Sequence, residues 1–390
     1  MNQELDMKHQ NVKQYIIDSI EKLNQENGNI IGEDVLDMCV NVFTSEKYDS
    51  DSEASIYQEI DNTLEKMLVE RDIRVQEQKR EKNDELNRLY LNSKEKYGNL
   101  DYFVIGTIQN EHIRGYHETK EVKLLDSLGT VSYGFYKGYS SPNEYELLVS
   151  RLGKIWNVSV ADYALSFDNN KLCGYSISSI QNKADYEYIS GYDFVKTNPD
   201  VESIVYQILN NPYEAKPNFS CEETKHFIEV LFQGFTDRIH NTEQLNQIKK
   251  DYLKAVLWNL LLDLKDFNYT NFGVLHDRIN DVYQLAPLFD NGSIKKNDMF
   301  EGTMVISLGR SKKDDILDLL FHDYYEFIHS FSEQLYLEYQ KAVKGEDSMI
   351  SRMMTCIGDT LISKEAEEYK IMVQSTLEKI IEQIQKKQNQ

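Results

Sequence analysis

Apolar residues recur at helical spacing through residues 1–97, between long runs of polar and charged residues. The pattern is plainest in residues 11–24, where one face carries Val12, Ile16, Ile17, Ile20 and Leu23. Residues 28–43 predict a second helix, and residues 54–75 predict a third that ends in a short strand-like piece. Residues 76–98 carry mixed charge, which is typical of an exposed connecting helix. This region fits a winged-helix module and a plain helical bundle equally well.

The pattern changes to strands at about residue 98. Runs of β-branched and aromatic residues predict five strands, at residues 100–108, 122–125, 133–139, 162–167 and 173–180. The turn Asp168–Asn170 is expected to join the last two as a hairpin. One helix is predicted at residues 141–157, with Ser141 as its N-cap and Glu144 completing a capping box. Its inner face is expected to consist of Tyr145, Leu148, Leu152 and Ile155.

Helical periodicity returns after residue 210 and continues to the end of the chain. Only the segment from Asp266 to about Ile306 breaks it, with strand-like pieces at residues 272–275 and 282–289. We therefore expect an α+β fold with two lobes, preceded by a helical N-terminal domain. The expected boundaries are 1–97 for the N-terminal domain, 98–210 for a small β-rich lobe and 211–390 for a larger helical lobe.

Charge and composition exclude several classes of function. The formal net charge is −22, and acids outnumber bases between Glu46 and Arg71, so direct nucleic-acid binding is not expected. A role in binding a protein partner or in dimerisation suits residues 1–97 better. Four separated cysteines and eight scattered histidines argue against a zinc or other transition-metal site. No run approaches the ~20 apolar residues of a membrane span, and no signal segment is visible, so we expect a cytoplasmic protein.

Four polar residues have the types and the order that phosphoryl transfer from a nucleotide requires. A lysine on a strand binds phosphates, a carboxylate orients the attacking hydroxyl, and oxygen ligands hold magnesium. Lys137 ends a predicted strand, and Asp266 follows one of the most apolar helical runs. Asn271 comes five residues later, which is the spacing of a kinase catalytic loop. Asp290 ends the second strand-like piece, and two short strands around a turn would bring it to Asn271. The alternative is that Asp266 and Asn271 are ordinary turn residues.

Three stretches make the chain resemble the HipA-like serine/threonine kinase family, which has a protein-kinase-like fold. They are YGFYKGYSSPNEYELLVSRLG, DFNYTNFGVL and YQLAPLFDNGS, in that order along residues 133–293. The resemblance implies that Asp266 is the catalytic base or the residue that orients the substrate, and that Lys137 binds the phosphates of ATP. It also implies that Asn271 and Asp290 bind Mg²⁺. Glu144 occupies the position of the family's Asn-Glu pair and is assigned to cofactor binding, with Glu146 as the alternative partner of Lys137.

The phosphate-covering loop is assigned to residues 126–134, which contain Gly129 and Gly134 but no complete glycine-rich motif. Ser127, Gly129 and Thr130 are therefore expected to contact the nucleotide. Because kinases of this family can autophosphorylate a serine in such a loop, Ser127, Thr130 and Ser132 are also candidate acceptors. Asn268 departs from the family, which usually has histidine at that position.

The leading hypothesis is an ATP- and magnesium-dependent protein kinase. The resemblance implies a toxin held by an antitoxin, or a role in phage defence, with the N-terminal domain as the surface for the protein partner. Two alternatives stay open. The first is a small-molecule kinase on the same fold, since an acidic rim would suit a cationic substrate. The second is a nucleotide-sensing binding module without catalysis.

Overall fold

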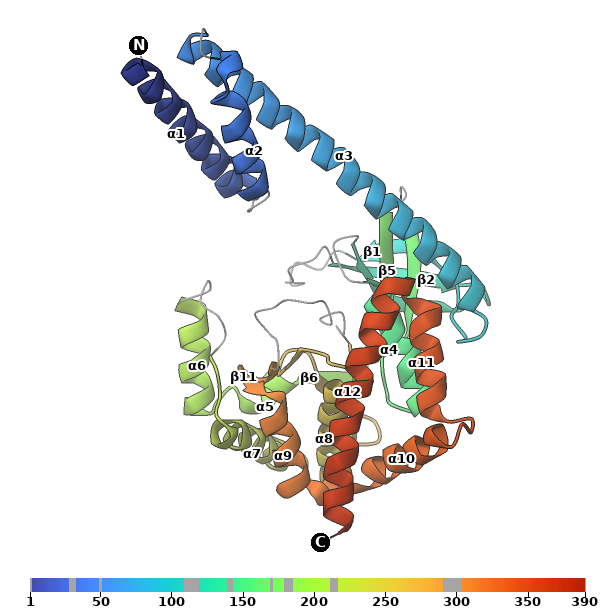
Figure 1. The fold of residues 1–390 in the computed structure, drawn as a ribbon. Helices are drawn as coiled ribbons and strands as arrows, with labels where there is room; N and C mark the ends of the chain where they lie inside the picture. Colours follow the sequence, from blue (N-terminus) through green and yellow to red (C-terminus); the bar gives the residue numbers. More distant parts are fainter. Residues whose placement is uncertain are drawn as a thin grey trace. The chain divides into compact units, whose positions relative to one another are not determined.

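The chain divides into two compact units, Met1–Glu81 and Lys82–Gln390. The computed structural model (Figure 1) describes residues 2–27, 33–48, 51–108, 119–138, 143–168, 171–178, 185–210, 217–289 and 303–389. The boundary between the units falls inside helix α3 (Glu53–Ser93), which Figure 1 shows as one uninterrupted helix. A single helix therefore takes the place of the third helix, strand-like end and connecting helix that the sequence pattern predicted.

The first unit is built from α1 (Asn2–Asn27), α2 (Glu33–Phe43), the short η1 (Glu46–Tyr48) and the start of α3. The expected apolar face of α1 is present, since Val12, Ile16 and Ile20 are buried at intervals of four residues. They pack on residues of α2 and α3 in one small core. The described residues up to residue 97 form helices and no strand, so they match the helical-bundle alternative and give no wing.

The second unit begins with a five-stranded antiparallel sheet in the order β1-β2-β3-β5-β4. Its strands are β1 (Tyr102–Ile108), β2 (Thr119–Asp126), β3 (Val131–Lys137), β4 (Tyr163–Asp168) and β5 (Lys171–Ile177). All five strands coincide with predicted ones. The pairing of Asp168 with Lys171 confirms the expected hairpin between the last two strands.

Helix α4 (Asn143–Trp156) connects β3 to β4 and is buried on almost every side. The sequence predicted one buried face, but every residue from Asn143 to Gly153 is buried. The helix contacts β4 and β5 of the sheet and also α11 (Met349–Thr360). Its polar residues are therefore inside the protein, where each must find a partner.

The rest of the second unit is mainly helical, which was predicted after residue 210, whereas two helices within residues 191–210 lie in the segment predicted to be rich in strands. Its helices are α5 (Gly191–Val195), α6 (Pro199–Asn210), α7 (Cys221–Arg238), α8 (Thr242–Leu261), α9 (Lys313–His322), α10 (Tyr325–Val343), α11 and α12 (Ser363–Gln388). Residues of α4, α8 and α10 meet in one core, where Trp156 lies 6.3 Å from Trp258 and 6.1 Å from Phe331 between ring centroids. Among the described residues, no helix is both long and apolar enough to cross a membrane.

Two small sheets interrupt the helices. One has the order β6-β8-β9 and consists of β6 (Tyr186–Ser190), β8 (Gly273–Asp277) and β9 (Val282–Leu285). The other has the order β11-β10-β7 and consists of β7 (Asp266–Asn268), β10 (Thr303–Ser307) and β11 (Gly309–Lys312). The strand-like pieces expected at residues 272–275 and 282–289 correspond to β8 and β9. The sequence pattern did not reveal the pairing of β7 with β10.

Candidate functional site

Lys137 forms a buried ion pair with Glu146. Its Nζ lies 2.6 Å from Glu146 Oε1, and the two side chains are only 11% and 5% exposed. Lys137 is the last residue of β3, and Glu146 lies in the first turn of α4. Because removing two charges from water is costly, a buried pair needs close geometry such as this one to offset that cost. Of the two glutamates considered as partners of Lys137, the structure selects Glu146.

Glu144 faces a different neighbour. Two residues along a helix are separated by about 200° of rotation, so Glu144 and Glu146 cannot reach the same lysine. Lys82 Nζ lies 2.9 Å from both Glu144 Oε1 and Glu365 Oε1, which ties α4 to α3 and α12. Burial alone would lower the pKa of Lys82, but these two carboxylates outweigh it and raise the pKa above its usual value. No contact seen here brings Glu144 toward Lys137, so its assignment to cofactor binding stays a prediction.

The turn assigned to the phosphates lies at the wrong end of its hairpin. In the pairing of β2 with β3, Leu125 is opposite Val131 and Thr119 is opposite Lys137. The turn formed by Ser127, Gly129 and Thr130 precedes Val131. At about 3.3 Å per strand residue it lies roughly 20 Å from Lys137 along β3. The structure therefore does not bring these three residues to Lys137, and they cannot share one phosphate site with it.

Asp126 explains why the turn has its conformation. Its Oδ1 accepts hydrogen bonds from the backbone N–H of Leu128 at 2.9 Å and of Thr130 at 2.8 Å. Gly129 has a φ of +84°, which glycine adopts without strain. The needs of a tight hairpin turn therefore explain the presence of Asp126 and Gly129.

The strand β7 holds Asp266 on the side of its sheet that faces away from the core. Phe267 is 3% exposed and packs on Tyr252 and Phe272, with ring centroids 5.7 and 5.1 Å away. Because side chains alternate along a strand, Asp266 and Asn268 lie together on the opposite face. Pairing with β10, where Asp266 is opposite Val305, fixes this strand at the end of the apolar helix α8.

Asn271 folds back onto Asp266. Its backbone N–H donates to Asn268 O, and its Nδ2 donates to Asp266 O, each at 3.0 Å. Since the amide nitrogen is engaged by the backbone, the amide oxygen is the end of Asn271 that can bind a cation. Oxygen ligands of this kind suit Mg²⁺. The structure thus brings Asn271 onto the backbone of Asp266 in one hydrogen-bonded loop, and the catalytic roles of the two residues stay a prediction.

A short hairpin leads from Asn271 toward Asp290. Strand β8 begins at Gly273, β9 ends at Leu285, and Ala286 N donates to Gly273 O at 2.8 Å. Leu288 is held from both sides, because its N–H donates to Ser159 O and its carbonyl accepts from Ala161 N. Asp290 itself lies outside the described residues, so the proposed metal pair of Asn271 and Asp290 stays a prediction. Among the described residues, no cluster of three or more His, Cys, Asp or Glu side chains could hold a metal ion.

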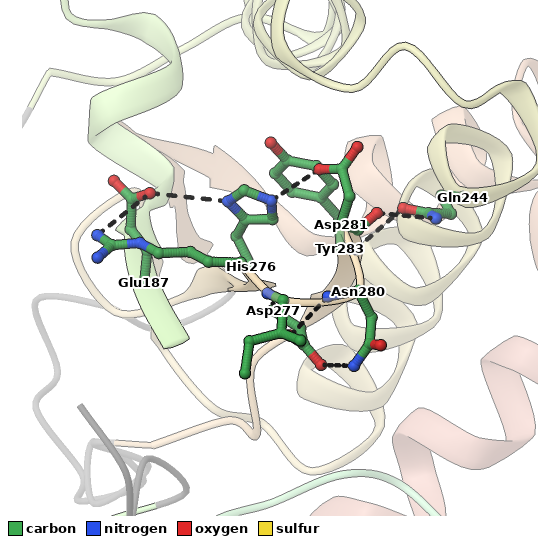
Figure 2. Close-up of polar contacts among 9 residues, drawn as sticks. Glu187, Gln244, His276, Asp277, Asn280, Asp281 and Tyr283 are labelled. Atoms are coloured by element: carbon green, nitrogen blue, oxygen red, sulfur yellow. Dashed lines mark hydrogen bonds and ion pairs between the residues drawn. The ribbon is translucent and has the colours of Figure 1, made fainter. Parts of the chain in front are cut away.

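The turn end of this hairpin is held by the polar network in Figure 2. His276 lies between Asp281, whose Oδ1 is 2.9 Å from Nε2, and Glu187 of β6, whose Oε2 is 3.7 Å from Nδ1. Its ring stacks on Tyr283 with centroids 4.0 Å apart. Gln244 of α8 accepts a hydrogen bond from Tyr283 N at 2.9 Å. His276 therefore helps to fix the hairpin through these contacts, and it lies at the far end of β8 from Asn271.

Sequence reasoning missed a buried arginine that holds α4 in place. Arg151 is fully buried, and it donates to Asn99 Oδ1 and to Thr360 Oγ1 of α11, each at 2.8 Å. Its guanidinium also lies 4.9 Å from the centre of the Tyr97 ring. Burial lowers the pKa of Arg151. The available signal was an arginine at an otherwise apolar helical position, which a single sequence does not distinguish from an exposed one.

No protein-family model matches this chain, and no curated protein matches it. Among solved structures, the Helicobacter pylori proinflammatory kinase CtkA is similar at 13% identity and a TM-score of 0.45, over 72% of this chain and 94% of its own. A chain in the Shewanella oneidensis MR-1 toxin–antitoxin complex of HipA, HipB and operator DNA is similar at 14% identity and a TM-score of 0.41, over 71% of this chain and 63% of its own. Likeness at this level assigns no activity, so the functional argument rests on the residues of the site.

Proposed function

We propose that this chain is an ATP- and magnesium-dependent phosphotransferase that phosphorylates a hydroxyl group of a protein, as a HipA-like serine/threonine kinase does. The observation that carries the proposal is the loop from Asp266 to Asn271. Its hydrogen bonds fold Asn271 onto the backbone carbonyl of Asp266, so that a carboxylate and an amide side chain belong to one short loop at the end of α8. An aspartate and an asparagine at this spacing after an apolar helix are the residue types that a kinase catalytic loop requires.

In the proposed reaction, Asp266 orients the acceptor hydroxyl and receives its proton as the oxygen attacks the γ-phosphorus of ATP. The bond between that phosphorus and the bridging oxygen breaks, and ADP leaves. Lys137, held by Glu146, provides positive charge for the phosphate oxygens. Asn271 and Asp290 would hold Mg²⁺, which neutralises negative charge on the phosphates when it is bound.

Mass spectrometry after incubation with Mg²⁺ and ATP tests the proposal. We expect the wild-type protein to phosphorylate itself or a protein added from a lysate, and Asp266→Asn to lose this activity. Asp277→Asn is the matched control, because Asp277 is a half-buried residue whose Oδ1 accepts hydrogen bonds from the turn between β8 and β9. An inactive wild-type protein that binds no nucleotide would refute the proposal. ATP turnover stimulated by an amine or an alcohol, without protein phosphorylation, would favour the small-molecule kinase instead.

We further propose that the activity arrests growth or acts in defence against phage, and that the first unit binds the protein that controls it. This extension rests on the resemblance to HipA-like kinases. Apolar side chains on that unit are exposed, including Met7 at 58% and Val42 at 47%. Induced expression in a bacterial host should slow growth for the wild type and not for Asp266→Asn. Equal growth arrest by both proteins would contradict the extension.

A further inference from the structure

Asn268 lies between Asp266 and Thr270 and contacts both. Its Nδ2 is 2.7 Å from Asp266 Oδ1. Its Oδ1 is 2.7 Å from Thr270 N and 2.5 Å from Thr270 Oγ1. Asn268 is half-buried, and its side chain shares a face of β7 with Asp266. The position is the one at which the chain departs from the family it resembles.

The contacts define which end of the amide faces which neighbour. A backbone N–H is only a donor, so the atom facing Thr270 N must be the amide oxygen. The amide nitrogen therefore faces Asp266 and donates a hydrogen bond to its carboxylate. Because Thr270 donates from both N and Oγ1, a flipped amide would lose two hydrogen bonds and place two oxygens face to face at Asp266.

We propose that Asn268 is a positioning residue for Asp266, an inference that rests on the proposed kinase function. Thr270 anchors the oxygen of the amide, and the nitrogen then fixes the plane of the Asp266 carboxylate for the acceptor hydroxyl. Catalysis by a positioned base depends on this geometry. This role requires a side chain with a hydrogen-bond acceptor at one end, toward Thr270, and a donor at the other end, toward Asp266. A neutral histidine also has one of each, which explains how the two residue types can serve at one position.

Asn268→Asp is the sharpest test, because it is nearly isosteric. The new carboxylate still accepts from Thr270 N and Oγ1, but it cannot donate to Asp266 and it faces that carboxylate with like charge. We expect kcat to fall by roughly 10²-fold, while KM for ATP and the melting temperature stay near wild type. Asn268→His should recover most of the activity that Asn268→Asp loses. Thr270→Val keeps the backbone donor and loses the hydroxyl, so its kcat should fall less.

The outcomes separate this inference from the proposed function. Wild-type kcat in both Asn268→Asp and Thr270→Val, with Asp266→Asn inactive, would overturn the positioning role and leave the kinase proposal standing. A raised KM for ATP at unchanged kcat would also overturn it, because Asn268 would then bind nucleotide. If Asn268→Asp does not fold, the kcat values of Thr270→Val and Asn268→His decide in its place. Absence of any transfer by the wild type would overturn both proposals.

Discussion

Two turns in this protein are held by similar side-chain hydrogen bonds but differ in their surroundings. In one, Asp126 accepts hydrogen bonds from the N–H groups of Leu128 and Thr130 and so closes the hairpin between β2 and β3. In the other, Asn268 accepts from Thr270 N and also donates to Asp266. The first turn stands at the free end of a sheet, where Leu128 is 77% exposed. The second rests on the buried rings of Tyr252, Phe267 and Phe272. The two turns therefore share their hydrogen-bond chemistry and differ in their support from the core.

The largest expected difference between the two turns is in catalysis. Asp266→Asn should lower the rate of phosphate transfer by roughly 10²- to 10⁴-fold, because it removes the group that accepts the proton. Asp126→Asn keeps an oxygen that can accept from the turn and should leave the rate unchanged. Initial rates with labelled ATP would measure both. Equal losses in the two variants would mean that the turns do not differ in function.

The two glutamates at the start of α4 provide the next comparison. Glu146→Gln weakens a charged hydrogen bond to Lys137 and should lower the transfer rate by roughly 10- to 100-fold. Glu144→Gln should leave the rate unchanged and lower the free energy of unfolding by about 1–3 kcal/mol, because it weakens the contact with Lys82. Kinetics and urea unfolding of the same two proteins would separate these effects. A Glu144→Gln variant with a lowered transfer rate and normal stability would instead support the assignment of Glu144 to nucleotide binding.

The stability effect at Glu144 should depend on pH. The pKa of Lys82 is raised above 10.5 in the folded protein. A raised pKa means that the folded state holds this proton more tightly than the unfolded state does. Its stabilisation is therefore fully present below about pH 10.5 and is lost as the pH rises through the higher folded pKa. The difference in unfolding free energy between wild type and Glu144→Gln should shrink above that pH, and a constant difference would contradict the assignment.

Gly273 and Gly129 lie near the two turns and are glycines for different reasons. Gly273 has close neighbours, whereas Gly129 has an unusual backbone conformation. A Cβ on Gly273 would meet the Tyr188 ring at 2.5 Å and Ile189 O at 2.6 Å, so Gly273→Ala should lower unfolding free energy by about 1–3 kcal/mol. It should also slow transfer, because β8 directly follows Asn271. Gly129 has open space around it and a positive φ, so Gly129→Ala should cost about 1 kcal/mol and leave the rate unchanged. Thermal unfolding and transfer rates of the two variants would test this. A normal transfer rate in a destabilised Gly273→Ala would contradict the expected link between packing at Gly273 and catalysis.

The smallest effect is expected at the turn that the sequence assigned to the phosphates. The double variant Ser127→Ala, Thr130→Val keeps the backbone hydrogen bonds to Asp126. Because the turn lies roughly 20 Å from Lys137, we expect no change in KM for ATP and no change in kcat. Steady-state kinetics over a range of ATP concentrations would detect a change. A raised KM for ATP would show that the turn reaches the nucleotide after all.

The sequence was most informative about the fold and the loop at Asp266 where residue type and residue spacing indicate the same element. The interval from Asp266 to Asn271, and the strands on either side of the turn at residues 278–281, follow from the pattern along the chain. The parallel pairing of β7 with β10 does not, since β7 has only three residues and its partner comes much later. Glu144 was placed ahead of Glu146 because it matches the family's Asn-Glu pair, while the rotation of α4 relative to β3 is not visible in the sequence. The burial of Arg151 could not be predicted either, because periodicity treats a charged residue as exposed.

The burial of α4 has a consequence for regulation. In a kinase that is switched by swinging this helix, one face of the helix must be free to leave its neighbours. Here α4 contacts the sheet, α11 and, through Glu144, Lys82. Arg151 of the helix also donates a hydrogen bond to Thr360 of α11. Displacing it would expose Leu147, Leu148 and Leu152, each worth roughly 1.5–3 kcal/mol when buried. The ion pair of Lys137 with Glu146 is therefore expected to stay assembled, because the helix that carries Glu146 cannot leave its neighbours without this cost.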